Sequence, residues 1–249
     1  MLDLDRRQVL GTAATLGAAA SLATVAVAPA SAAATQGAGL TPDQALARLR
    51  DGNRRFVEDT SPRPDITTSR RLAIAQGQTP FAALVGCADS RVGPEYLFGT
   101  GLGDLFIVRT AGNYVDDAGF GSLAYAVAEL KVPLIVVLGH EKCGAVAAAN
   151  AVVNDNTQLP PSLLRMVQPI LPASIDARAR REPGEDLLDR AVHLNVKRVA
   201  ESLRATSDPL LAAPLAARTL RVVGAYYDLK TGAVDFFDTH PVAAAATAH

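Results

Sequence analysis

Two short apolar runs, residues 81–85 and 133–138, constrain the fold of this chain more than any other feature. Each run has the length and the continuous apolar character of a strand that is buried on both faces of a sheet. Each run also leads into a motif that contains one of the chain's two cysteines. The motifs are Gly86-Cys87-Ala88-Asp89-Ser90-Arg91 and Gly139-His140-Glu141-Lys142-Cys143-Gly144.

The rest of the chain alternates between strand and helix patterns. Further strands are predicted at 104–108, 220–227 and 233–237. Helical periodicity, caps and prolines predict helices at 41–57, 69–75, 94–98, 122–130, 144–153, 162–178 with breaks at Pro169 and Pro172, 186–205, and between Pro209 and Pro214. This alternation predicts an α/β fold, with a mostly parallel central sheet of about five strands flanked by helices. A short turn at 230–232 makes the last strand antiparallel.

The N-terminus has the pattern of a twin-arginine (Tat-type) export signal. Arg6-Arg7 precedes a run of small and apolar residues at 9–28, and Ala30-Ser31-Ala32 fits a cleavage site. We therefore predict a cleaved signal peptide at 1–32, a linker at 33–40, a folded domain at 41–239 and a disordered tail at 240–249. An N-terminal membrane anchor is the alternative, although alanine, glycine and threonine make the run only mildly apolar.

The charge balance argues against two classes of partner. The formal net charge is −1, so nothing in the composition indicates binding to nucleic acid or to an anionic membrane. No other stretch is long and apolar enough to span a bilayer, so we expect no stable membrane association after cleavage. Export itself would permit a disulfide between the two cysteines.

The neighbours of the cysteines favour a metal over a disulfide. Cys87 and Asp89 are two residues apart, which in extended backbone places them on the same side. His140 and Cys143 are three apart, which brings them together in one helical turn. Two thiolates, an imidazole and a carboxylate form a plausible tetrahedral zinc set if the two strands are neighbours. A disulfide requires neither the carboxylate nor the imidazole.

These motifs resemble those of the β-class carbonic anhydrases. The resemblance rests on two motifs, Cys87-Ala88-Asp89-Ser90-Arg91-Val92 and Gly139-His140-Glu141-Lys142-Cys143-Gly144. The runs at 52–56, 103–113 and 222–229 also match the family. The resemblance implies one zinc ion per chain, held by Cys87, His140 and Cys143. The fourth position belongs to water or hydroxide, or to Asp89 in a closed form from which Arg91 can draw it away.

The resemblance further implies reversible hydration of carbon dioxide to bicarbonate and a proton, with Asp89 and Arg91 as catalytic residues. By family position, Phe106, Ala111 and Tyr125 line the substrate pocket, and Gln78 donates a hydrogen bond to the substrate. Part of this wall comes from a second subunit, which implies a homodimer or a dimer of dimers. A bicarbonate inhibitor pocket built around a tryptophan is not expected, since Leu84 stands in that region and the chain has no tryptophan.

Three other interpretations of the two cysteine motifs remain open from the sequence. The same ligands would serve a hydrolase of carbonyl sulfide or carbon disulfide. An exported zinc-binding protein whose site stays closed by Asp89 would not be an enzyme. A metal-free disulfide scaffold would use only the two cysteines.

Overall fold

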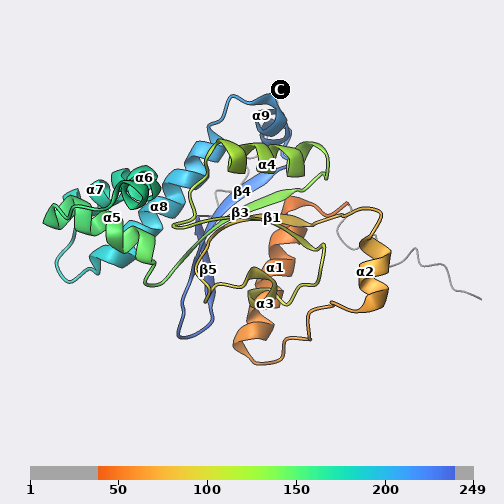
Figure 1. Ribbon diagram of the computed structural model, residues 1–249. Coiled ribbons are helices and arrows are strands. Elements are labelled where there is room, and N and C mark those ends of the chain that lie inside the picture. Colours follow the sequence, from red (N-terminus) through yellow and green to blue (C-terminus); the bar gives the residue numbers. More distant parts are fainter. Residues whose placement is uncertain (1–38, 239–249) are drawn as a thin grey trace, which may run out of the picture.

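The computed structural model of this protein describes residues 39–238 (Figure 1). The predicted signal peptide at 1–32, the predicted tail at 240–249 and most of the predicted linker at 33–40 lie outside the described residues. The helices are α1 (Pro42–Val57), α2 (Thr68–Ile74), α3 (Pro94–Leu97), α4 (Asp117–Ala128), α5 (Gly144–Asp155), α6 (Pro161–Val167), the 3-10 turn η2 (Gln168–Ile170), α7 (Leu171–Ala179), α8 (Leu187–Arg204) and α9 (Pro209–Ala216).

One mixed sheet organises the described residues. Its strands are β1 (Ala82–Cys87), β2 (Leu105–Thr110), β3 (Leu134–His140), β4 (Arg221–Tyr227) and β5 (Val234–Asp238), in the spatial order β2-β1-β3-β4-β5. β1, β2, β3 and β4 pair in parallel, and β5 pairs antiparallel with β4. The predicted α/β class, the number of strands and the antiparallel last strand are therefore confirmed.

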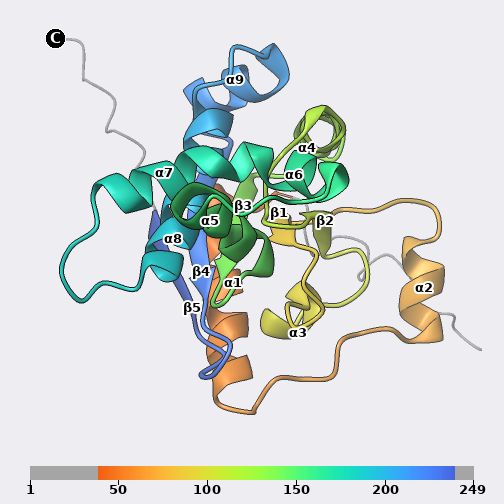
Figure 2. The same cartoon turned by 60° about the vertical axis from the view of Figure 1, so that its left-hand side comes forward.

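Helices cover both faces of the sheet, as the buried strands require (Figure 1). Alternate strand residues pack against α1 and α3 on one face, where Leu49, Leu84 and Val136 belong to the same core cluster. The other set packs against α4, α8 and α9. Figure 1 shows α5, α6 and α7 gathered beside α8 and away from α2, and Figure 2 shows α5 and α7 next to α8 from another side. Together with α8, α5 and α7 form a third core cluster that contains both cysteines.

Glycine at position 139 allows α8 to approach the sheet closely. A Cβ atom there would lie 2.6 Å from Val196 Cγ2 and 2.8 Å from Val192 Cγ1, both on α8. A side chain would therefore force the helix away from β3 in a fully buried region. Because Gly139 precedes His140, this close contact also determines the position of His140 at the end of β3.

Several element boundaries differ from the sequence predictions for identifiable reasons. β1 extends through Cys87, so this cysteine belongs to the strand and not to the turn after it. Thr67 caps α2 in place of the predicted Ser69, by accepting a hydrogen bond from the Arg70 backbone N–H. Pro214 was predicted to border its helix but lies inside α9. No helix within residues 39–238 combines the length and apolar character of a membrane span.

Candidate metal centre

The two cysteine motifs meet at the carboxyl ends of neighbouring parallel strands. β1 and β3 are paired directly, with Gly86 opposite Leu138. Cys87 is the last residue of β1, and His140 is the last residue of β3. Cys143 follows as the N-cap of α5, so its sulfur lies near the positive end of that helix. The predicted convergence of the ligand motifs is confirmed.

The donor atoms of this cluster have the spacing of a metal site. Among residues 39–238, the group formed by Cys87, His140 and Cys143 has ligand atoms that all lie within 4.8 Å of one another. The two sulfurs are 3.9 Å apart. Zn–S bonds of about 2.3 Å at tetrahedral angles would place two sulfurs roughly 3.8 Å apart, so the separation fits zinc.

The histidine is oriented for metal binding. His140 Nδ1 lies 2.9 Å from the Glu141 carbonyl oxygen. Because a carbonyl can only accept, Nδ1 carries the proton and Nε2 carries a free lone pair. His140 is fully buried, and Nε2 has no hydrogen-bond partner. A buried nitrogen acceptor without a partner is costly unless a ligand occupies it, so this atom fits a zinc ion.

The two thiols form a coupled acid–base pair. The hydrogen bond with Cys143 lowers the pKa of the Cys87 thiol, against the opposing effect of burial. The same bond, together with burial, raises the pKa of Cys143. Because zinc takes both sulfurs as thiolates, metal binding requires Cys143 to lose its proton.

Asp89 is turned toward Arg91 in this structure. The Arg91 guanidinium donates from Nε to Asp89 Oδ1 at 2.9 Å and from a terminal nitrogen to Oδ2 at 2.7 Å. These bonds hold the pKa of Asp89 well below its usual range, so the carboxylate stays ionised. Asp89 Oδ2 nevertheless lies 3.9 Å from His140 Nε2, at the edge of the ligand cluster. The carboxylate is therefore close to the metal position and already fully paired with arginine.

A second arginine holds the backbone of the first motif. Arg109, on β2, donates from Nε to the Cys87 carbonyl at 2.9 Å and from a terminal nitrogen to the Asp89 carbonyl at 2.7 Å. Arg109 belongs to the run at 103–113 that supports the family resemblance, but the sequence does not predict that its side chain holds this backbone. The contact depends on β2 lying beside β1, which strand patterns alone do not specify.

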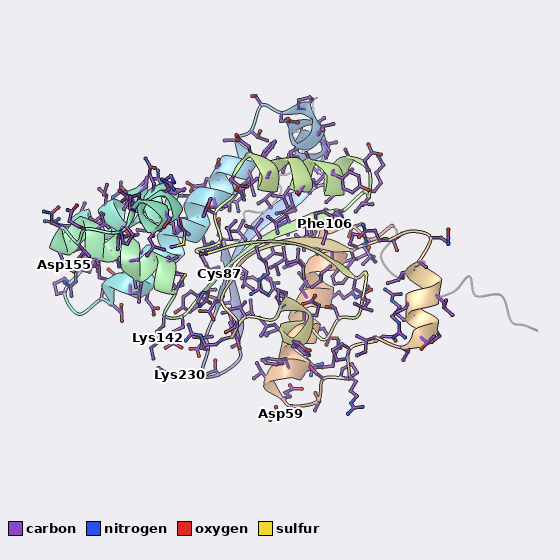
Figure 3. The ribbon with its side chains drawn as sticks, viewed as in Figure 1. Asp59, Cys87, Phe106, Lys142, Asp155 and Lys230 are labelled. Carbon is purple, nitrogen blue, oxygen red and sulfur yellow. The ribbon has the colours of Figure 1, made fainter. Side chains whose placement is uncertain are left out.

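The predicted pocket residues divide into two groups. Ala111 follows β2 and packs against the cluster that contains both cysteines. Phe106 pairs with Ala83, four residues before Cys87, which places it about 13 Å away along the strand. In Figure 3 the labelled Phe106 and Cys87 lie apart from each other.

Tyr125 and Gln78 also lie away from the two cysteines. The Tyr125 ring packs against Phe106, with ring centroids 6.3 Å apart. Gln78 is exposed and precedes β1, at the end of that strand opposite Cys87. The fold therefore brings together the three zinc ligands, Asp89, Arg91 and Ala111, and leaves Phe106, Tyr125 and Gln78 apart from them.

Comparison with known proteins gives a consistent result. The family model described as carbonic anhydrase matches residues 82–234. Carbonic anhydrase 2 of Mycobacterium tuberculosis is 42% identical over 192 residues, which cover 77% of this chain and 90% of that protein. The carbonic anhydrase of Mycolicibacterium smegmatis is 42% identical over 197 residues, covering 78% and 92% of the two chains.

Solved structures show the same likeness. The β-carbonic anhydrase CafA of Aspergillus fumigatus superposes with a TM-score of 0.62 and 26% identity, covering 80% of this chain and 91% of that one. One of two tetrameric β-carbonic anhydrases from Sordaria macrospora superposes with a TM-score of 0.58 and 29% identity, covering 66% and 83%. The family match, the relatives and the site geometry all point to the same kind of metal centre.

Proposed function

The chain belongs to the β-class carbonic anhydrase family. We propose that it hydrates carbon dioxide at a zinc site with one open ligand position, and that the Asp89–Arg91 pair controls whether this position stays open. The protein is a zinc-dependent carbonic anhydrase, a lyase that interconverts carbon dioxide and bicarbonate. The observation that carries the proposal is the convergence of two cysteine sulfurs and the free His140 Nε2, beside a carboxylate that is already paired with arginine.

The three protein ligands define the catalytic type of site. Cys87, His140 and Cys143 would hold the ion, and a zinc site with three protein ligands keeps one position for a small molecule. When bound, zinc lowers the pKa of a water molecule toward about 7, which supplies a nucleophile near neutral pH. The residues around the site then determine how that nucleophile meets the substrate.

Asp89 and Arg91 act as a unit in this proposal. The two hydrogen bonds from Arg91 hold the carboxylate in one orientation beside the ligand cluster. A carboxylate oxygen can then accept a hydrogen bond from the nucleophile and orient its lone pair toward the carbon of carbon dioxide. Ala111 contributes a small apolar wall beside the ligands, which suits a small apolar substrate.

Hydration assays across pH test this proposal directly. We expect the zinc-loaded protein to hydrate carbon dioxide at neutral pH, with activity that is low in acid and rises with pH. An inactive zinc-loaded protein at pH 7 would contradict an open site, and activity that begins only in alkali would indicate that Asp89 closes it.

We also propose that the functional unit is at least a homodimer. β2 lies at the edge of the described sheet, and Tyr125 is 49% exposed although its ring packs on Phe106. A second protomer seated against this face would cover the exposed ring. It would also allow Phe106, Tyr125 and Gln78 to complete a pocket that they do not reach in their own protomer. The similarity to tetrameric β-carbonic anhydrases supports a dimer of dimers as a further step.

Replacing Tyr125 with a charged residue tests the proposed dimer. Tyr125→Arg should weaken association by about 2 kcal/mol or more, roughly 30-fold in Kd, because an aromatic side chain that the proposed interface would bury is replaced by a charge. Sedimentation velocity should show a shift toward monomer, together with lower hydration activity. Ile175→Arg, at a 53% exposed position on α7, is the matched control and should remain assembled. A Tyr125→Arg variant that stays assembled and active would place the interface elsewhere.

For the N-terminal segment we propose removal of residues 1–32 during twin-arginine export. The support is the sequence pattern of Arg6-Arg7, the apolar run and the cleavage site. Folded export would allow zinc to be loaded in the reducing cytoplasm, before an oxidant reaches the two thiols.

A double substitution tests this route. Arg6→Lys with Arg7→Lys should leave an uncleaved precursor in the cytoplasm, detected by cell fractionation and immunoblotting. Arg180→Lys with Arg181→Lys is the matched control, because this arginine pair is exposed on the folded domain. Normal export of the first variant would exclude the twin-arginine route.

A further inference from the structure

The sulfur of Cys87, one of the metal ligands, accepts a hydrogen bond from the loop that follows a different strand. The Gly112 backbone N–H lies 3.3 Å from Cys87 Sγ and donates to it. Gly112 follows β2, whereas Cys87 ends β1, so the bond joins two separate segments. A hydrogen bond to a thiolate withdraws negative charge from the sulfur and weakens it as a donor to the metal.

The position of Gly112 is closely determined. Its φ angle is +87°, which favours glycine, and a Cβ atom would lie 2.4 Å from Ile170 Cδ1 and 3.1 Å from Ala145 Cβ. The residue is therefore enclosed by η2 and α5. Steric enclosure limits where Gly112 can lie. A directional contact to its carbonyl, in the 112–113 peptide group, would also hold the adjoining 111–112 peptide group, whose N–H faces the sulfur.

Asn195 supplies that contact from α8. Its side-chain Nδ2 donates to the Gly112 carbonyl oxygen at 2.8 Å, and the residue is only 2% exposed. Asn195 lies among the apolar positions of α8, beside Val192 and Val196. A buried amide in an apolar stripe is retained only where it satisfies a specific partner. Here that partner is the residue whose N–H faces the ligand sulfur.

We propose that Asn195 is a positioning residue that holds the Gly112 N–H on Cys87 and thereby sets the donor strength of the metal site. Two thiolates donate much charge to zinc and would make it a weak acid. An N–H bond to one sulfur offsets part of that donation. The inference rests on the proposed function for its catalytic meaning, and the contact itself can be tested independently of catalysis.

The first measurement uses the wild-type protein. In protein loaded with ¹¹³Cd and labelled with ¹⁵N-glycine, the Gly112 amide proton should show scalar coupling to the metal through the Cys87 sulfur. This readout requires the N–H···S bond and is independent of hydration activity. Absence of this coupling, with the cadmium bound and the other glycine amides resolved, would overturn the proposal.

The second measurement removes the amide donor. In Asn195→Leu, which keeps similar volume, we expect loss of the Gly112–cadmium coupling. In cobalt-loaded protein, the sulfur-to-cobalt charge-transfer band should move to longer wavelength, because the thiolate becomes a stronger donor. Hydration should fall about 10–100-fold, with its pH midpoint raised. Asn195→Ala, which also lacks the donor, gives the same test if the leucine variant does not fold.

Asn53 offers a matched control. It is also a buried amide, and its Nδ2 donates to the carbonyls of Leu97 and Gly232, which are not part of the ligand cluster. Asn53→Leu should lose stability yet keep the cobalt band and the Gly112 coupling. If Asn195→Leu keeps both as well, Asn195 has only a structural role. Failure of the wild-type protein to hydrate carbon dioxide would reject the proposed function and leave the coupling result interpretable.

Discussion

Replacement of Cys143 by serine is expected to remove zinc and hydration activity together. Cys143 supplies one of three converging donors, and its sulfur lies 3.9 Å from that of Cys87. A serine hydroxyl remains protonated at neutral pH, so it replaces a charged ligand by a weak neutral one. The loss of zinc affinity should exceed the roughly 10–100-fold that follows removal of an outer-shell partner.

Metal analysis of purified protein checks this expectation. Wild type should contain about one zinc per chain, and Cys143→Ser should contain little after dialysis against a mild chelator. Ala149→Ser is the matched control, since it introduces the same hydroxyl at a fully buried position of the same helix. The control should keep its zinc. Full zinc content and activity in Cys143→Ser would reject the ligand assignment.

The sequence predicted the fold class and the ligands because both depend on local patterns. Continuous apolar runs identify strands buried on two faces, and β1 and β3 show that pattern without interruption. The motif spacings then placed Cys87, His140 and Cys143 at the ends of those strands. What the runs did not specify was the strand order, on which the convergence of the motifs depends.

The remaining differences come from tertiary contacts and from caps. The prediction at 122–130 was wrong for the first turns of α4, which begins at Asp117 because Asp116 caps it and accepts a hydrogen bond from the Gly119 N–H. Gly119 and Gly121 lie in those turns, and glycine has a low helix propensity. Arg109 and Asn195 were missed because their partners lie on other elements. A buried asparagine within the apolar stripe of α8 is the one local signal that could have drawn attention to position 195.

Removal of the charge on Asp89 separates its two possible roles. As a permanent fourth ligand, Asp89 would help to hold zinc, and its loss would loosen the metal. As an orienting acceptor paired with Arg91, its loss would spare zinc and reduce turnover. The structure favours the second role, because the carboxylate makes two side-chain hydrogen bonds to Arg91 while three other donors converge on the metal position.

We therefore expect Asp89→Asn to retain zinc and to lose at least about 10–100-fold in hydration rate. The amide keeps the size of the side chain and can still accept a hydrogen bond through its oxygen. It lacks the charge that pairs with Arg91, so its orientation is no longer fixed. Stopped-flow hydration assays and metal analysis on the same preparation measure both quantities.

Two further variants sharpen the result. Arg91→Ala should also reduce hydration, and by freeing the carboxylate it should favour the closed form, so that its remaining activity requires higher pH. Asp176→Asn is the matched control, since Asp176 pairs with Arg198 at 3.0 Å in an exposed ion pair outside the ligand cluster. This control should hydrate carbon dioxide normally, because exposed pairs contribute little to stability. Near-normal hydration by zinc-loaded Asp89→Asn would show that the dyad neither orients the nucleophile nor gates the metal.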